Sequence, residues 1–168
     1  MPLIRPGALL LFQLACALVP PGAFPENDRI TVSATPDGAA QITVPGRRKI
    51  VVPKEYGQAG ISDTAVAADG TAGWLVTYNV DGVSYPISGK LVVWRDGRVI
   101  QRFESEQVFY SWAFVAGSKQ IAYHDGPLHG EQASHCELHD LATGRVIDKW
   151  EGDLEGAGKP AWTEGLKH

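Results

Sequence analysis

The sequence predicts an all-β domain of four-stranded antiparallel sheets that follows an export signal. The chain is rich in residues that form turns, with 19 glycines and 11 prolines among 168 residues, and its aromatic residues recur in short apolar runs. An internal repeat further favours stacked, similar sheets. The length is that of a single domain, and 44% hydrophobic with 20% charged residues is typical of soluble globular proteins.

Residues 1–23 have the features of a secretory signal peptide. Arg5 is the only charged residue in this stretch, and an apolar run covers residues 8–19. Because about 20 residues are needed to span a bilayer, this run predicts a cleaved signal, and an N-terminal anchor helix is the alternative. We expect cleavage after Ala23, export to the periplasm or the medium, and a mature domain of residues 24–168 without a transmembrane span.

The segment from Gln13 to Cys16 resembles a lipoprotein signal, which makes lipid anchoring through Cys16 a second form of export. Removal of the signal would leave Cys136 without a cysteine partner. The domain would then depend on core packing and not on a disulfide, even in an oxidising compartment.

Two nine-residue segments repeat each other closely. Residues 96–104 read DGRVIQRFE, and residues 143–151 read TGRVIDKWE. Each pattern predicts a tight turn followed by a strand, with Gly97 and Gly144 supplying the positive φ of the turn.

The segments upstream of these turns repeat more loosely, and they extend the repeat to two units, 61–104 and 109–151. Four short antiparallel strands in a unit of 40 to 50 residues are typical of a propeller blade. The predicted strands are 61–68, 73–80, 90–95, 98–104, 109–116, 119–125, 134–140 and 145–151.

The turn sequences carry a resemblance to a known architecture. Residues 139–146, HDLATGRV, and the shorter version in residues 93–99, VWRDGRV, resemble the turn between the third and fourth strands of WD-repeat and TolB-type propeller blades. This resemblance covers about residues 60–152 and implies stacked four-stranded blades, but it implies no particular ligand. A β-sandwich with two similar hairpins is the alternative fold.

The two ends of the domain suggest a third blade. Residues 29–53 predict three strands with turns at Asp37-Gly38 and Pro45-Gly46, and residues 160–166 resemble the start of another unit. A C-terminal strand that joins the N-terminal three would complete a blade. Propellers typically have four to eight blades, so three blades would form a compact assembly, a ring of two chains, or a sandwich.

The charge pattern argues against a polyanionic partner. The net charge is −4, and the one run of basic residues, Arg47-Arg48-Lys49, is short. Nucleic acids and anionic membranes are bound by clustered lysine and arginine, so we expect neither as the main partner.

A histidine-rich segment is the candidate for metal chemistry. Four of the five histidines lie in residues 124–139. Alternation along a strand would place His135, Glu137 and His139 on one face, with Cys136 on the other. Imidazole and carboxylate groups are ligands of divalent transition metals, whereas an alternating polar strand also describes a solvated face. The metal candidates are His124, His129, His135, Glu137 and His139.

No catalytic set stands out. His135 and Cys136 are adjacent in a strand and would point apart, and no serine has nucleophile-elbow spacing. A binding or assembly module without a cofactor is therefore favoured over an enzyme. A metal-binding protein or metal-dependent enzyme, and a remnant of a longer propeller that stops soon after Trp162, are the alternatives.

Two long loops are the candidates for ligand binding. Residues 81–89 and 125–133 each join the second strand of a unit to the third, so both should emerge at one rim. We expect a protein or small-molecule ligand there, or self-association. The candidate ligand-binding residues are Tyr85, Asp125, His129 and Glu131.

Overall fold

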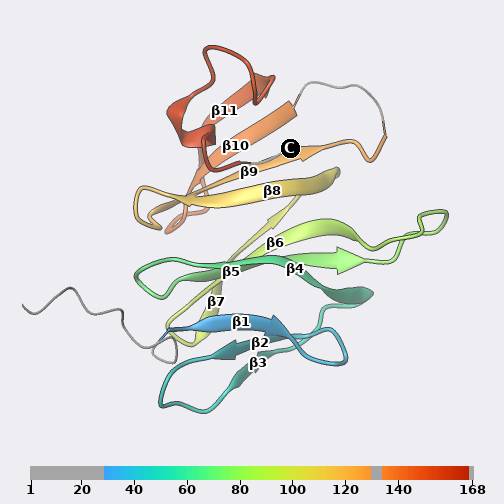
Figure 1. The fold of residues 1–168 in the computed structure, drawn as a ribbon, viewed down its shortest axis with the longest axis vertical. Helices are drawn as coiled ribbons and strands as arrows, with labels where there is room; N and C mark the ends of the chain where they lie inside the picture. The colour runs from blue at the N-terminus through green and yellow to red at the C-terminus, as the bar shows by residue number, and fades with distance from the viewer. Residues whose placement is uncertain (1–28, 130–133, 167–168) are drawn as a thin grey trace, which may run out of the picture.

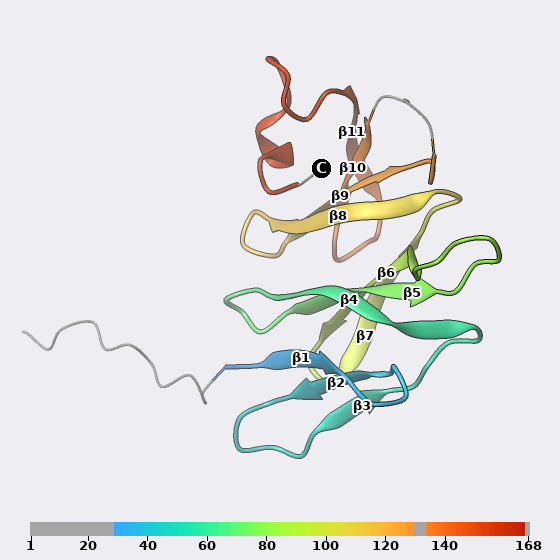
Figure 2. The ribbon, with the colours of Figure 1, turned by 45° about the vertical axis from the view of Figure 1, so that its right-hand side comes forward.

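The computed structural model describes residues 29–129 and 134–166, and it is an all-β fold of three antiparallel sheets (Figure 1). The predicted signal peptide and Glu131 lie outside the described residues. The sheets are stacked face to face and do not close into a ring (Figure 2). The N-terminal sheet has three strands, and the central and C-terminal sheets have four each.

In every sheet the strands follow one another in chain order, each paired with the next. The N-terminal sheet contains β1 (Thr31–Ala34), β2 (Ala40–Thr43) and β3 (Ile50–Val52). The central sheet contains β4 (Gln58–Val66), β5 (Ala72–Tyr78), β6 (Ile87–Arg95) and β7 (Arg98–Glu104). The C-terminal sheet contains β8 (Val108–Val115), β9 (Gln120–Gly126), β10 (Ser134–Asp140) and β11 (Val146–Gly152).

Alternation along β5 shows how the central sheet is covered on both faces. Trp74 and Val76 pack against Ile42 of the N-terminal sheet, whereas Leu75 packs towards Trp112 and Ile121 of the C-terminal sheet. A strand that is buried on both faces consists largely of apolar residues, as β5 does. The two interfaces between the sheets therefore form the core of the molecule.

The expected fourth strand of the N-terminal sheet does not form from residues 160–166. Residues Ala161–Thr163 instead form a short 3-10 helix, η2, which follows Pro160. Leu154, Trp162 and Leu166 pack against the outer face of the C-terminal sheet. This covers apolar residues such as Leu138 that would otherwise face water, whereas a strand in the distant N-terminal sheet would leave them exposed.

Removal of residues 158–168 is expected to destabilise the protein, because Trp162 and Leu166 would no longer cover the C-terminal sheet. Loss of a buried leucine alone costs about 2–5 kcal/mol, so the melting temperature should fall by several degrees. Thermal unfolding followed by circular dichroism checks this. Replacement of the exposed Val51 with alanine is the control, and a truncated chain that melts with the native protein would contradict the packing role.

Candidate functional site

The two loops predicted to bind a ligand leave the same end of the stacked sheets. The β5–β6 connection, residues 79–86, and the start of the β9–β10 connection, which follows Gly126, both lie at the right of Figure 1. Tyr85 is 56% exposed, and His129 is also exposed. Asp125 is buried, so it contributes to the structure under the loops and not to their surface.

The buried carboxylate of Asp125 is hydrogen-bonded by two neighbours, which offsets the cost of its burial. Ser105, between β7 and β8, donates a hydrogen bond to Oδ2, and Nδ1 of His135 lies 2.5 Å from Oδ1. Oε1 of Glu137 lies 3.5 Å from the other ring nitrogen of His135. Since His135 lies between two carboxylates, it links the rim to a polar cluster deeper in the sheet.

Glu137 is the centre of that polar cluster. The hydroxyl of Tyr123 donates to Oε2 of Glu137 over 2.5 Å, and Nε2 of His139 lies 2.8 Å from the same oxygen. Lys149 from β11 forms an ion pair with Oε1. His139 is held in place because its Nδ1 lies 3.1 Å from the carbonyl oxygen of Gly144 and its ring contacts Phe103.

The contacts of Glu137 determine its protonation state. Burial, the largest single influence, raises the pKa of the carboxyl group, but hydrogen bonds from Lys149, Tyr123 and His139 outweigh it. The resulting pKa of Glu137 is about 2. Burial and the neighbouring Glu137 carboxylate raise the pKa of Tyr123 far above its usual value. The cluster is therefore a buried anion surrounded by donors, which stabilises the fold at neutral pH.

The predicted metal ligands are divided between the two faces of the C-terminal sheet. His135, Glu137 and His139 share the face that packs against the central sheet, as strand alternation predicts. His124 pairs with Cys136 in the register of β9 and β10 and lies on the opposite face, where its ring is 5.1 Å from that of Tyr110. His124 and the other three residues therefore do not converge.

The part of the chain that the structure describes contains no group of three or more histidine, cysteine, aspartate or glutamate residues arranged to hold a metal. The contacts of Glu137 give a physical reason. Lys149 pairs with Oε1, while Tyr123 and His139 contact Oε2. Protein donors therefore take the positions from which a metal would be bound.

Cys136 is an inert core residue. Its side chain is fully buried beside Leu138 and Leu154. Burial raises the pKa of the Cys136 thiol to about 12, so thiolate is scarce at neutral pH. This environment does not support nucleophilic chemistry.

Sequence reasoning singled out Tyr85 but missed two other exposed tyrosines at the same end. Tyr56, between β3 and β4, is fully exposed, and Tyr110, near the start of β8, is 45% exposed. Tyr110 also donates a hydrogen bond to the carbonyl oxygen of Pro127. We call the end formed by residues 35–39, 53–57, 79–86, 105–107 and 127–129, together with Tyr110, the tyrosine rim.

Comparison with known proteins gives no family. No protein-family model matches the chain, and no curated protein matches its sequence. Among the described residues, no helix is long and apolar enough to cross a membrane. The functional argument therefore depends on the chain's own residues.

Proposed function

We propose that this protein is an exported, propeller-like binding module that recognises its ligand at the tyrosine rim. Residues 1–23 would act as the signal peptide or, through Cys16, provide a lipid anchor. Residues 24–168 would then work outside the cytoplasm, without a cofactor, on a protein or small-molecule ligand. The placement of the exposed tyrosines at one end of the stack is the observation on which the proposal chiefly rests.

The similarity of the central and C-terminal sheets supports the propeller-like part of the proposal. Each sheet is a meander of four strands, and a glycine with positive φ lies in the last connection of each: Gly97 has φ of 87° and Gly144 has φ of 72°. The two sheets pack face to face through Leu91, Phe103 and Trp112, among others. Adjacent blades of a propeller pack in this manner.

The three tyrosines support recognition at the rim. A tyrosine side chain offers a large rigid surface and a hydroxyl group, and it loses little conformational entropy when a ligand covers it. Tyr56, Tyr85 and Tyr110 come from three different connections or strand starts, but they lie at one end of the molecule. The exposed acidic residues of this end, Asp37, Asp81 and Glu106, outnumber its exposed Lys54, and Glu55 is neutralised by Lys90 and Arg102. A ligand with sugar or peptide character and no strong negative charge suits such a surface.

The two outer faces of the stack argue against the packing of a further sheet at either end. The outer face of the N-terminal sheet carries Thr31, Ser33, Gln41 and Thr43, which suit water better than another sheet. The outer face of the C-terminal sheet is covered by the segment that follows β11. Repeat proteins use polar or covered terminal faces in this way to stay soluble. Ligand binding at a rim is therefore favoured over ring formation through these faces.

Replacement of Tyr85 with alanine is expected to weaken ligand binding at least about tenfold, because exposed tyrosines are frequent binding hot spots. Full-length protein applied to oligosaccharide and peptide arrays would first identify a ligand. Titration calorimetry of the native protein and of Tyr85→Ala and Tyr56→Ala would then measure the dissociation constants.

Val51→Ala is the matched control, because Val51 is an exposed apolar residue on the outer face of the N-terminal sheet. It should bind as the native protein does. A ligand whose affinity is unchanged by both tyrosine replacements would contradict recognition at this rim.

A further inference from the structure

The end of the stack opposite the tyrosine rim is rich in positive charge. It is formed by five hairpin turns, residues 44–49, 67–71, 95–98, 116–119 and 140–145, which we call the basic rim. These turns contain seven lysine and arginine residues but three aspartates, although the whole chain has a net charge of −4. The turns that follow β2, β4, β6 and β8 lie together at the left of Figure 1.

Contacts between the turns show that the basic rim is one continuous surface. Arg95 reaches from β6 to the turn after β8, where it donates to the carbonyl oxygen of Ser118 over 2.9 Å. The backbone N–H of Leu141 donates to the carbonyl oxygen of Lys119, which joins the turn after β10. Arg47 and Asp96 line one cleft, which joins the turn after β2 to the turn after β6.

Most of the positive charge on this rim is not neutralised. Six of its cations are exposed and form no ion pair within the described residues, namely Arg47, Arg48, Lys49, Arg98, Lys119 and Arg145. Of the aspartates, Asp69 is paired with Arg95, and Asp140 accepts hydrogen bonds from Thr143. Asp96 is the remaining exposed carboxylate of the rim. At the other end of the stack, by contrast, Lys90 and Arg102 are paired with Glu55.

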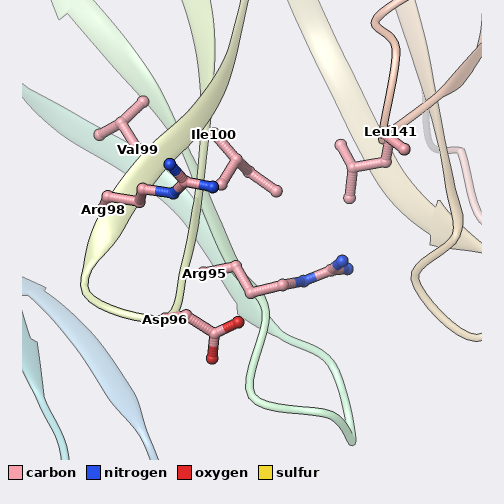
Figure 3. A pocket seen from close by; sticks show the side chains of 7 residues that line it. Arg95, Asp96, Arg98, Val99, Ile100 and Leu141 are labelled. Atoms are coloured by element: carbon pink, nitrogen blue, oxygen red, sulfur yellow. The ribbon is translucent and has the colours of Figure 1, made fainter.

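Two clefts give this charged surface its shape. Figure 3 shows the first, of about 370 Å³, where Arg98 and Asp96 lie on the hairpin and Arg95 extends towards the side of Leu141. The second, of about 450 Å³, is lined by Arg47, Asp96 and Trp94. The buried indole N–H of Trp94 finds no acceptor among the described residues. That N–H is shielded from solvent, so it belongs to the interior beneath the cleft and offers no contact to a surface ligand.

The first residues that the structure describes lie at the basic rim. Arg29 and Ile30 lie beside the turn after β4, and Ile30 lines the same cleft as Arg47. The apolar run of residues 8–19 precedes Arg29 by only nine residues. Nine residues reach at most about 30 Å, and the twelve residues between Cys16 and Arg29 reach about 40 Å, so a membrane-bound apolar run or an acylated Cys16 would keep this end of the domain within that distance of the bilayer.

We propose that the basic rim docks on an anionic phospholipid surface. The free arginines and lysines would lie at the level of the headgroup phosphates, and the tyrosine rim would face away from the membrane. Each Lys or Arg close to an anionic surface strengthens binding about fivefold. The proposal does not depend on the tyrosine rim, because the two surfaces lie at opposite ends of the stack.

The fold explains why the sequence argued against such a partner. Along the chain, the free cations are spread from Arg47 to Arg145, and only one run is evident. Each group of cations lies in a hairpin turn at the same end of its sheet, and stacking then brings the turns together. The cluster therefore exists in space but not in the linear sequence.

Sedimentation of full-length protein with vesicles tests the proposal. One set of vesicles contains phosphatidylcholine alone, and the other contains equal amounts of phosphatidylcholine and phosphatidylglycerol. The measured quantity is the ratio of the two partition coefficients. The apolar N-terminal residues contribute similarly to both coefficients, so their contribution largely cancels in the ratio. We expect a ratio well above one at low salt that falls steeply when added salt shortens the Debye length.

Charge variants locate the binding surface. The double variant Arg47→Gln/Arg48→Gln should lower the ratio roughly 25-fold, and Arg98→Gln about fivefold. Asp96→Asn removes an exposed carboxylate of the rim that forms no ion pair among the described residues, and it should raise the ratio. Lys54→Gln, at the opposite end, is the matched control and should leave it unchanged. Because these arginines are exposed and form no ion pairs with residues that the structure describes, circular dichroism should show native folding.

Three results would overturn the proposal. The first is a ratio near one for the native protein, and the second is a ratio that the arginine variants leave unchanged. The third is displacement of bound protein by inorganic phosphate at matched ionic strength, or binding to DNA in preference to vesicles. Either form of the third result would assign the rim to a discrete phosphate or to a nucleic acid. Tyr85→Ala should bind vesicles normally, so failure of the tyrosine rim and failure of the basic rim are distinguishable.

Discussion

Replacement of Trp112 with alanine is expected to lower the free energy of unfolding by about 4 kcal/mol. Trp112 lies in β8, is 6% exposed, and fills the interface between the central and C-terminal sheets. Its indole N–H donates to the carbonyl oxygen of Asp63 in β4 over 2.8 Å, and its ring packs edge-on against Phe114. Alanine would leave a cavity and remove one of the hydrogen bonds that join the two sheets.

Gly73 provides a sharp test of this packing. A Cβ atom at Gly73 would lie 2.5 Å from Cη2 of Trp112, because the ring rests directly on the backbone of β5. Gly73→Ala should therefore cost about 1–3 kcal/mol by overpacking. In a Trp112→Phe background the smaller ring should reduce that cost.

Urea unfolding of the four proteins in this double-mutant cycle measures the coupling between the two positions. Costs that simply add would show that the indole and Gly73 do not constrain each other. A Trp112→Ala protein that unfolds at the native urea concentration would contradict the role of the indole in joining the sheets.

Strands and turns were predictable from the sequence because they depend on local patterns. The expected strand 134–140 coincides with β10, and 98–104 coincides with β7. Alternation also placed Glu137 and His139 on one face correctly. Such features need only the period of a strand and the positive φ that glycine tolerates.

Features that depend on contacts between sheets were not predictable in the same way. The sequence treated the face of Glu137 as solvated or metal-binding, but Phe103 of the central sheet covers His139 there. Residues 160–166 resembled a strand, yet burial of Leu166 on the C-terminal sheet decided their conformation. The basic rim likewise depends on which turns the stacking brings together. Local sequence patterns do not contain these long-range contacts.

Glu137 is expected to give the protein a marked loss of stability in acid. Its pKa is about 2 in the folded protein and 4.5 in an exposed glutamate. Because folding lowers this pKa, the stabilisation is fully present above about pH 4.5 and is lost as the pH falls towards 2. The loss is on the order of 3 kcal/mol across that range.

Glu137→Gln isolates this contribution from those of other carboxylates such as Glu55, whose pKa is also lowered by Lys90 and Arg102 against the effect of burial. The variant should lose about 2 kcal/mol at neutral pH, because Lys149, Tyr123 and His139 lose a charged acceptor. Its stability should then depend less on pH than that of the native protein between pH 4.5 and 2.

Urea unfolding at a series of pH values measures both effects, with Glu106→Gln as the control at an exposed carboxylate. The control should follow the native curve. If the stability of Glu137→Gln falls in acid as steeply as that of the native protein, the Glu137 carboxylate is not held by its three donors. The polar cluster then does not stabilise the C-terminal sheet. If the two curves converge near pH 2, protonation of Glu137 removes the same interactions that the substitution removes. The cluster is then an electrostatic link from β9 through β10 to β11.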